Sequence, residues 1–237
     1  MKQIRSPLRY PGGKSKAIDK IKHYLPPHFS EYREPFMGGG SVFIYLKQKH
    51  PQLKFWINDL NFDLICFWNQ IQLNLDGLVQ AIWHIKRNTT DGRELFKQFA
   101  FDRSSNLPEF ERAVRFFVLN RITFSGTVDC GGYSQKAFDQ RFTDSAIDRL
   151  SALAGLLDQV TITHLDYSEV LSAPGKDVFI FLDPPYLAAT NSRLYGKRGD
   201  LHLAFDHQKF AEHFHCQRIL HADDISGSTR NVEIQLT

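Results

Sequence analysis

Five consecutive apolar residues, Val178-Phe179-Ile180-Phe181-Leu182, constrain the fold of this chain more than any other segment. β-Branched and aromatic residues without polar alternation are typical of a strand that is buried on both faces, as in a parallel sheet. Asp183-Pro184-Pro185-Tyr186 follows directly, and prolines end a strand because they cannot donate to its ladder. Open α/β sheets bind ligands at the carboxyl ends of their strands. The segment therefore predicts a central strand that ends in a binding site, although Asp-Pro also occurs in ordinary turns.

The composition is that of a globular chain with a small positive charge. Its 237 residues are 42% hydrophobic and 23% charged, and the formal net charge of +3 is compatible with a polyanionic partner without identifying one. Cys66, Cys130 and Cys216 are far apart, so we expect no zinc site and no disulfide framework, and a reducing cytoplasm is the simplest compartment. No apolar run is long enough to span a membrane, and the first residues lead into no signal segment.

The order of the predicted elements places a helical segment inside a strand–helix core. Short strands and helices alternate over residues 1–60, helical periods dominate 61–121, a Gly- and Thr-rich stretch at 122–143 predicts an irregular hairpin, and the alternation returns near residue 145. We therefore expect an α/β fold with a discontinuous core, residues 1–60 and 145–237, and an inserted module, residues 61–144. Strands are expected at 31–36, 53–57, 160–164 and 178–182, and core helices at 15–24, 41–49, 145–157 and 205–215.

A glycine-rich turn, Phe36-Met37-Gly38-Gly39-Gly40-Ser41, follows the first predicted strand and opens a helix. Glycines let the backbone turn tightly and approach a ligand, and a helix N-terminus offers free N–H groups to an anionic group. The spacing matches neither Gly-x-Gly-x-x-Gly nor a P-loop. A purely structural turn is the alternative for this segment taken alone.

Two further segments carry candidate ligand-binding side chains. Asp59 follows the second predicted strand, where an acid accepts hydrogen bonds from ribose hydroxyls; an equally weighted alternative is a cap for a helix that starts at Asn61. Tyr10 and Lys14 flank a Pro-Gly-Gly turn. Lys14 would neutralise a ligand carboxylate, and Tyr10 would pack against an apolar or cationic group. A solvated loop lysine is the simpler interpretation of Lys14 by itself.

Taken together, these segments resemble the Dam-type (D12 class) DNA adenine-N6 methyltransferases, which use S-adenosylmethionine. The match is carried, in this order, by Tyr10-Pro11-Gly12-Gly13-Lys14, the turn at 34–40, Asn58-Asp59 and Asp183-Pro184-Pro185-Tyr186. Weaker similarity runs through Leu119-Asn120-Arg121. The resemblance implies a Rossmann-like methyltransferase sheet with an inserted, mostly helical target-recognition module.

The resemblance also implies a role for each matched residue. Tyr10, Lys14, Asp59 and Asp183 would contact S-adenosylmethionine, and the glycine turn would hold its methionine part. Asp183 and Pro184 would act in catalysis by accepting hydrogen bonds from the N6 amino group of adenine, which favours the nucleophilic form of the nitrogen. The target base must leave the duplex to reach them, and Tyr186 would stack on it.

The resemblance further implies double-stranded DNA as the partner, no metal, and a cytoplasmic monomer, bacterial or phage-encoded, that associates with the nucleoid through DNA. A partner restriction nuclease and a phage context are left open. Cations and amides of the insert would contact DNA, or else belong to solvated helix faces: these are His84–Arg87, Arg112, Arg115, Asn120, Arg121, Lys136 and Arg141.

Two other functions stay open. Methylation of cytosine N4, or of RNA, would use the same methyl transfer to an exocyclic amino group. A truncated remnant that binds cofactor or DNA without turnover is the other alternative, because only Arg218–His221 and Val232–Leu236 look strand-like beyond residue 215. We therefore expect the C-terminal strands to be incomplete.

Overall fold

The structure, a computed structural model, describes residues 3–101, 106–185, 205–212 and 233–236. All strand pairs in its sheet are parallel, and the order is β3-β2-β1-β4-β5. This is the order of a doubly wound sheet, which has its switch point between β1 and β4. The predicted Rossmann-like α/β fold is confirmed. The strands are β1 (Glu31–Glu34), β2 (Lys54–Asn58), β3 (Val160–Thr163), β4 (Val178–Leu182) and β5 (Glu233–Leu236).

β4 is buried on both faces, as its five apolar residues predict. Phe179 and Phe181 belong to the larger apolar cluster, together with Phe43 of α2 (Ser41–Lys49). The other three side chains of β4 belong to a second cluster that includes α9 (Tyr167–Ser172). Apolar side chains therefore cover both faces of β4, an inner strand between β1 and β5, and its carboxyl end leads into the site described below.

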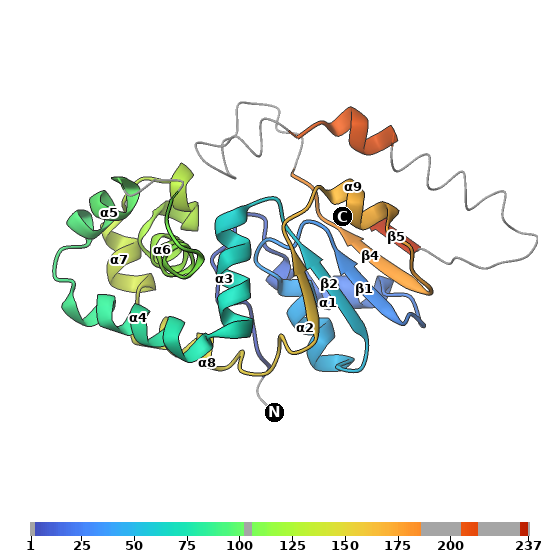
Figure 1. The fold of residues 1–237 in the computed structure, drawn as a ribbon, viewed down its shortest axis with the longest axis horizontal. Helices are drawn as coiled ribbons and strands as arrows, with labels where there is room; N and C mark the ends of the chain where they lie inside the picture. Colours follow the sequence, from blue (N-terminus) through green and yellow to red (C-terminus); the bar gives the residue numbers. More distant parts are fainter. Residues whose placement is uncertain (1–2, 102–105, 186–204, 213–232, 237) are drawn as a thin grey trace, which may run out of the picture.

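The insert forms a helical lobe beside the sheet, and α3 (Phe62–Leu73) lies between the lobe and the sheet (Figure 1). The other helices of the insert are α4 (Leu75–Asn88), α5 (Gly92–Phe101), α6 (Glu109–Ile122) and α7 (Gln135–Arg141), and α8 (Asp144–Ser151) follows them. Asn74 separates α3 from α4, and its side chain caps α4 by accepting a hydrogen bond from the backbone N–H of Gly77.

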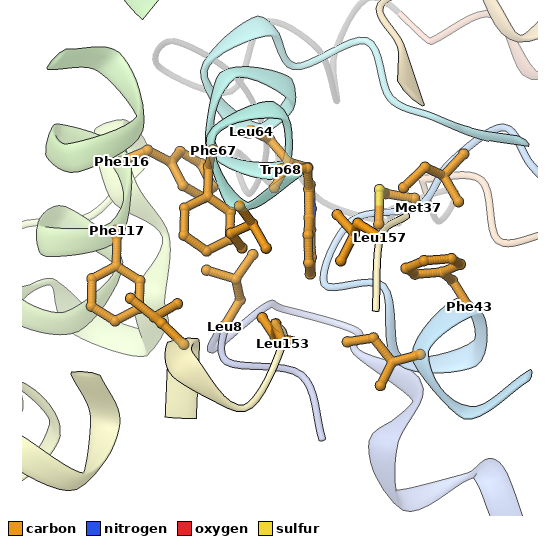
Figure 2. Packing of buried hydrophobic residues seen from close by; sticks show 14 of the residues in the cluster. Leu8, Met37, Phe43, Leu64, Phe67, Trp68, Phe116, Phe117, Leu153 and Leu157 are labelled. Atoms are coloured by element: carbon orange, nitrogen blue, oxygen red, sulfur yellow. The ribbon is translucent and has the colours of Figure 1, made fainter. Parts of the chain in front are cut away.

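One continuous apolar core joins the insert to the sheet. Phe67 and Trp68 of α3 and Phe116 and Phe117 of α6 lie in the same buried cluster as the side chains of α2 (Figure 2). The rings of Phe67 and Phe117 are stacked, with centroids 5.8 Å apart. α3 contributes to both parts, so the division at residues 61 and 144 stays a prediction.

The structure differs from the sequence prediction where short helices are concerned. The single helix expected at 15–24 is three pieces, two 3-10 turns around α1 (Ile18–Ile21). The expected hairpin at 122–143 reduces to one antiparallel bridge, between Thr123 and Tyr133, followed by α7. Ser134 starts α7 because its hydroxyl caps the N–H of Ala137, a local signal that the glycine-rich composition obscured.

The C-terminal prediction is only partly covered by the described residues. The expected helix at 205–215 is described over 207–212, and the expected strand at 232–236 corresponds to β5, which pairs with β4. The expected strand Arg218–His221 lies outside the described residues. The prediction of an incomplete set of C-terminal strands stays a prediction.

Candidate active site

A pocket lies at the carboxyl ends of β1, β2 and β4, where the doubly wound sheet has its switch point. The structure brings together in it the four segments that the sequence singled out. Tyr10, Lys14, Asp59, Asp183 and Pro184 all line the pocket. Tyr186, the predicted stacking residue, lies outside the described residues.

The glycine turn after β1 forms the floor of this pocket and tolerates no side chain at two positions. Gly38 and Gly40 have φ values of +47° and +64°, in the left-handed region that favours glycine. A Cβ atom on Gly38 would lie 2.7 Å from Cε1 of Tyr10, and one on Gly40 would lie 2.8 Å from Cε of Met37. The ring of Tyr10 thus packs directly on the turn, so it shapes the pocket as well as facing it.

Asp59 ties the glycine turn to the start of α3. One of its carboxylate oxygens accepts from the backbone N–H of Gly38 at 2.9 Å, and the other accepts from Asn61 at 3.0 Å. Burial raises the pKa of Asp59 above its ordinary value, and these two hydrogen bonds oppose the shift. The cap of α3 is Asn61 itself, whose side chain accepts from Leu64, so the cap alternative for Asp59 is wrong.

Asn58, at the end of β2, holds three loops of the pocket together. Its side chain donates to the carbonyls of Pro35 and Leu165 and accepts from Leu165 N–H and the Thr163 hydroxyl, over 2.8 to 3.0 Å. It is 1% exposed, so the Asn58 amide itself is shielded from water. In the sequence, Asn58 stands out only as the residue before Asp59 in the Asn58-Asp59 motif. Its position as a polar residue at the end of a buried strand is the signal that could have identified its role.

Lys14 and Asp183 form an ion pair inside the pocket. Nζ of Lys14 lies 2.6 Å from both carboxylate oxygens of Asp183, and the side chains are 12% and 20% exposed. Nζ also donates to the Gly12 carbonyl at 3.2 Å. Lys14 was predicted to neutralise a ligand carboxylate. In this structure it neutralises the carboxylate of Asp183, at the end of β4. The solvated-loop alternative for Lys14 is wrong.

Glu34, the last residue of β1, is a buried acid that lines the same pocket. Its Oε2 accepts from the hydroxyl of Tyr32 at 2.7 Å and from the N–H of Phe43 at 3.1 Å. Burial raises the pKa of Glu34 to about 8, and the nearby charges of Asp183 and Asp59 add to this rise. The sequence analysis gave this residue no role of its own.

This pKa predicts a pH-dependent stability that Glu34→Gln removes. The unfolded chain releases the Glu34 proton above the ordinary pKa of 4.5, whereas the folded protein keeps it up to about pH 8. The free energy of unfolding therefore falls as the pH rises between these values, by up to about 1.4 kcal/mol per pH unit for one group, and this contribution levels off above pH 8. Urea unfolding at pH 5, 6.5 and 8 measures this fall in the free energy of unfolding. Parallel pH profiles for wild type and Glu34→Gln would contradict the prediction.

An aromatic wall closes one side of the pocket. Phe36, Tyr167 and Phe205 line it, and the ring of Phe36 lies 5.4 Å from that of Tyr167 and 5.7 Å from that of Phe205. Asp166 stands at the edge of this wall and caps α9 in a capping box with Glu169. Sequence reasoning missed Phe205, which comes from a helix-flanking segment with no motif.

Four of the predicted DNA-contacting residues are buried: Arg112, Arg115, Asn120 and Arg121. Arg112 and Arg115 of α6 donate to the two carboxylate oxygens of Asp63 at 2.6 and 3.4 Å, and all three are buried. Asn120 donates to the carbonyl of Arg9 and accepts from its N–H, which fixes the N-terminal loop on α6. Neither DNA contact nor a solvated helix face fits these side chains, so that prediction is wrong for Arg112, Arg115 and Asn120.

Within the described ranges, no group of three or more His, Cys, Asp or Glu residues is arranged to hold a metal ion, and no helix is both long and apolar enough to cross a membrane.

Comparison with known proteins agrees with this arrangement. Residues 10–226 match the family model of the D12 class N6 adenine-specific DNA methyltransferases. A type II methyltransferase, M.MjaIII, of Methanocaldococcus jannaschii is 27% identical over 78% of this chain and 70% of its own length. A DNA adenine methylase of Salmonella typhi is 29% identical over 80% of this chain and 68% of its own length. A DNA N-6-adenine-methyltransferase of Escherichia phage P1 is 27% identical over 86% of this chain and 27% of its own length.

Proposed function

This chain belongs to the D12 class of N6 adenine-specific DNA methyltransferases, and we propose that its pocket binds S-adenosylmethionine beside Asp183 and receives a flipped-out adenine of a short duplex sequence. The observation that carries the proposal is the convergence of four separated segments on one pocket at the switch point of the sheet. That family methylates N6 of adenine in DNA.

The pocket offers a complementary group for each part of S-adenosylmethionine. The glycine turn leaves the backbone bare at Gly38 and Gly40, which gives room for the methionine part. Lys14, which pairs with Asp183 in this structure, would supply the positive charge for the cofactor carboxylate. Asp59, whose oxygens accept from the backbone N–H groups of Gly38 and Asn61, would also accept from a ribose hydroxyl. The aromatic wall gives an apolar surface for the adenine ring, with Asp166 at its edge as an acceptor.

The bound cofactor supplies a methyl group on a sulfonium, which is a good leaving group. Asp183 and the carbonyl of Pro184 would accept hydrogen bonds from the two amino hydrogens of the target adenine. The lone pair of that nitrogen is delocalised into the ring, so acceptors that favour the pyramidal form make it nucleophilic. These bonds strengthen as positive charge develops on nitrogen, and they therefore stabilise the transition state more than the ground state.

The adenine has to leave the duplex, because N6 inside a base pair cannot reach the carboxyl end of β4. Residues 61–144 would recognise the DNA sequence. We infer a monomer that acts in the cytoplasm of a bacterium or a phage-infected cell. We also propose a partner restriction nuclease, because one relative, M.MjaIII, is named a type II methyltransferase.

Transfer of a labelled methyl group tests the proposal. We expect incorporation into unmethylated duplex DNA, N6-methyladenine in the digested product, and a short common sequence around the modified adenines. Methylated cytosine, or incorporation into RNA alone, would favour the other amino methyltransferase reactions. Cofactor binding without any transfer would favour a binding protein.

Lys14→Gln is expected to weaken cofactor use more than DNA use. Loss of one charge-assisted hydrogen bond in a partly buried site costs about 1.5–3 kcal/mol, which corresponds to about a 10- to 100-fold lower kcat/KM for S-adenosylmethionine. The KM for DNA should change much less. Steady-state kinetics with each substrate varied in turn measures both values.

Lys16→Gln is the matched control, because Lys16 lies in the same turn but is exposed and outside the pocket. Equal effects of the two substitutions on kcat/KM for the cofactor would show that Lys14 acts only through the general charge of this loop.

A further inference from the structure

Asn120, in the last turn of α6, is a buried polar side chain that fastens the insert to the N-terminal segment. It is 0% exposed, and its amide group bonds to backbone groups with both its nitrogen and its oxygen. Nδ2 donates to the carbonyls of Arg9 and Gly126 at 2.7 and 3.0 Å, and Oδ1 accepts from the N–H of Arg9 at 3.0 Å. Two bonds to one residue fix its orientation as well as its position.

Gly126, in the turn that follows α6, packs against Arg9 as well. Its φ is +75°, and a Cβ atom at this position would collide with the carbonyl oxygen of Arg9 and lie 2.8 Å from its Cβ atom. The side chain of Arg9 also donates to the carbonyl of Thr123, at 3.3 Å. The insert therefore holds Arg9 at its backbone and at its side chain.

The residue held in this way directly precedes Tyr10, which lines the pocket. Tyr10 packs closely on the glycine turn: a Cβ atom added to Gly38 would lie 2.7 Å from its ring, and one added to Gly39 would lie 3.0 Å from its Cβ atom. The hydroxyl of Ser6 donates to the carbonyl of Gly39. The N-terminal segment thus contacts the insert through Arg9 and the glycine turn through the residues on either side.

The backbone around Arg9 has little freedom to absorb a displacement. Leu8, just before it, is buried and points into the apolar cluster that α3 and α6 share (Figure 2). Pro11 follows Tyr10, and a proline restricts the backbone of the residue before it. A shift of Arg9 is therefore passed on to Tyr10.

We propose that Asn120 is a positioning residue for the cofactor, which sets the place of the Tyr10 ring in the pocket through the backbone of Arg9. The proposal rests on the function proposed above, because it takes S-adenosylmethionine to be the ligand of the pocket. Asn120 does not line the pocket itself, so it acts on the cofactor only through Tyr10. A small displacement of a positioned group is enough to weaken its contact with a ligand.

Binding of S-adenosylhomocysteine, the demethylated form of the cofactor, tests the proposal and is measured by isothermal titration calorimetry. Asn120→Ala should weaken this binding about 10-fold, the size expected for one displaced ring contact or hydrogen bond. Gly126→Ala should weaken it similarly, because its methyl group would displace Arg9. Asn74→Ala is the matched control: it removes the cap of α4, elsewhere in the insert, and should lower the melting temperature without changing the dissociation constant.

A double-mutant cycle tests whether the effect passes through Tyr10. In a Tyr10→Ala background the ring is absent, so Asn120→Ala should weaken binding further by less than about 2-fold. The same 10-fold loss in both backgrounds would overturn the assigned role. Thermal melts identify a temperature at which the variants are folded, and the titrations are made there. If Asn120→Ala does not fold, Gly126→Ala takes its place in the cycle.

The outcomes separate this proposal from the proposed function. If wild type binds S-adenosylhomocysteine and both Asn120→Ala and Gly126→Ala bind it equally well, the positioning role is overturned and the proposed function stands. Wild type that binds no cofactor would overturn both. An equal loss of affinity in Asn74→Ala would show that a weakened insert is sufficient to lower the affinity, and would also overturn the positioning role.

Discussion

Asp183→Asn should reduce the rate of methyl transfer by about 10²- to 10³-fold while the protein still folds and binds DNA. An amide keeps one acceptor oxygen, but its NH₂ group would face the amino group of adenine, where only acceptors can help. Removal of one aligned electrostatic group from an active site costs rate of about this size. Single-turnover transfer of a labelled methyl group, with enzyme in excess over DNA, reports the chemical step directly.

Asp177→Asn is the matched control for this substitution. Asp177 precedes the opposite, amino end of β4 and has a φ of +50°, a conformation that asparagine tolerates well. Its backbone carbonyl accepts from Ser30 and Glu31, and the substitution leaves that carbonyl in place. Normal transfer by Asp183→Asn, or an equal loss in Asp177→Asn, would refute the role assigned to Asp183.

Asp63→Ala should destabilise the protein by about 3–5 kcal/mol. Its carboxylate pairs with both Arg112 and Arg115 and joins α3 to α6, so its removal takes the neutralising charge away from two buried cations. α3 and α6 also share the apolar core of Figure 2, and the loss should therefore appear in global unfolding. Urea unfolding monitored by circular dichroism measures the change.

Two further variants serve as controls for Asp63→Ala. Asp76→Ala removes an exposed acid from the first turn of α4 and should cost about 1 kcal/mol or less. Replacing Asp63, Arg112 and Arg115 together with apolar residues should recover much of the loss, because the penalty comes from unpaired charge rather than from the missing pair. If Asp63→Ala is as stable as Asp76→Ala, the ion pairs across α3 and α6 do not hold the insert in place.

Local sequence signals predicted the elements that frame the pocket. The bounds of α2 and β4 match the prediction, since an apolar run before two prolines and a glycine turn before a helix are both short-range patterns. The prediction missed the helix α9, although Asp166 and Glu169 have the spacing of a capping box, because the helix spans only six residues. The helix expected at 15–24 breaks because its apolar residues, Ile18 and Ile21, fill only one turn.

The sequence by itself determined which chemical groups stand at the carboxyl ends of the strands: the glycine turn, Asp59 and Asp183 each follow a strand pattern that is legible without the fold. The tertiary structure decided which groups face one another. It paired Lys14 with Asp183 and buried Arg112 and Arg115 against Asp63. Periodicity and turn chemistry are properties of neighbours in the chain, whereas the partner of a charged side chain depends on which distant elements pack together and exclude water.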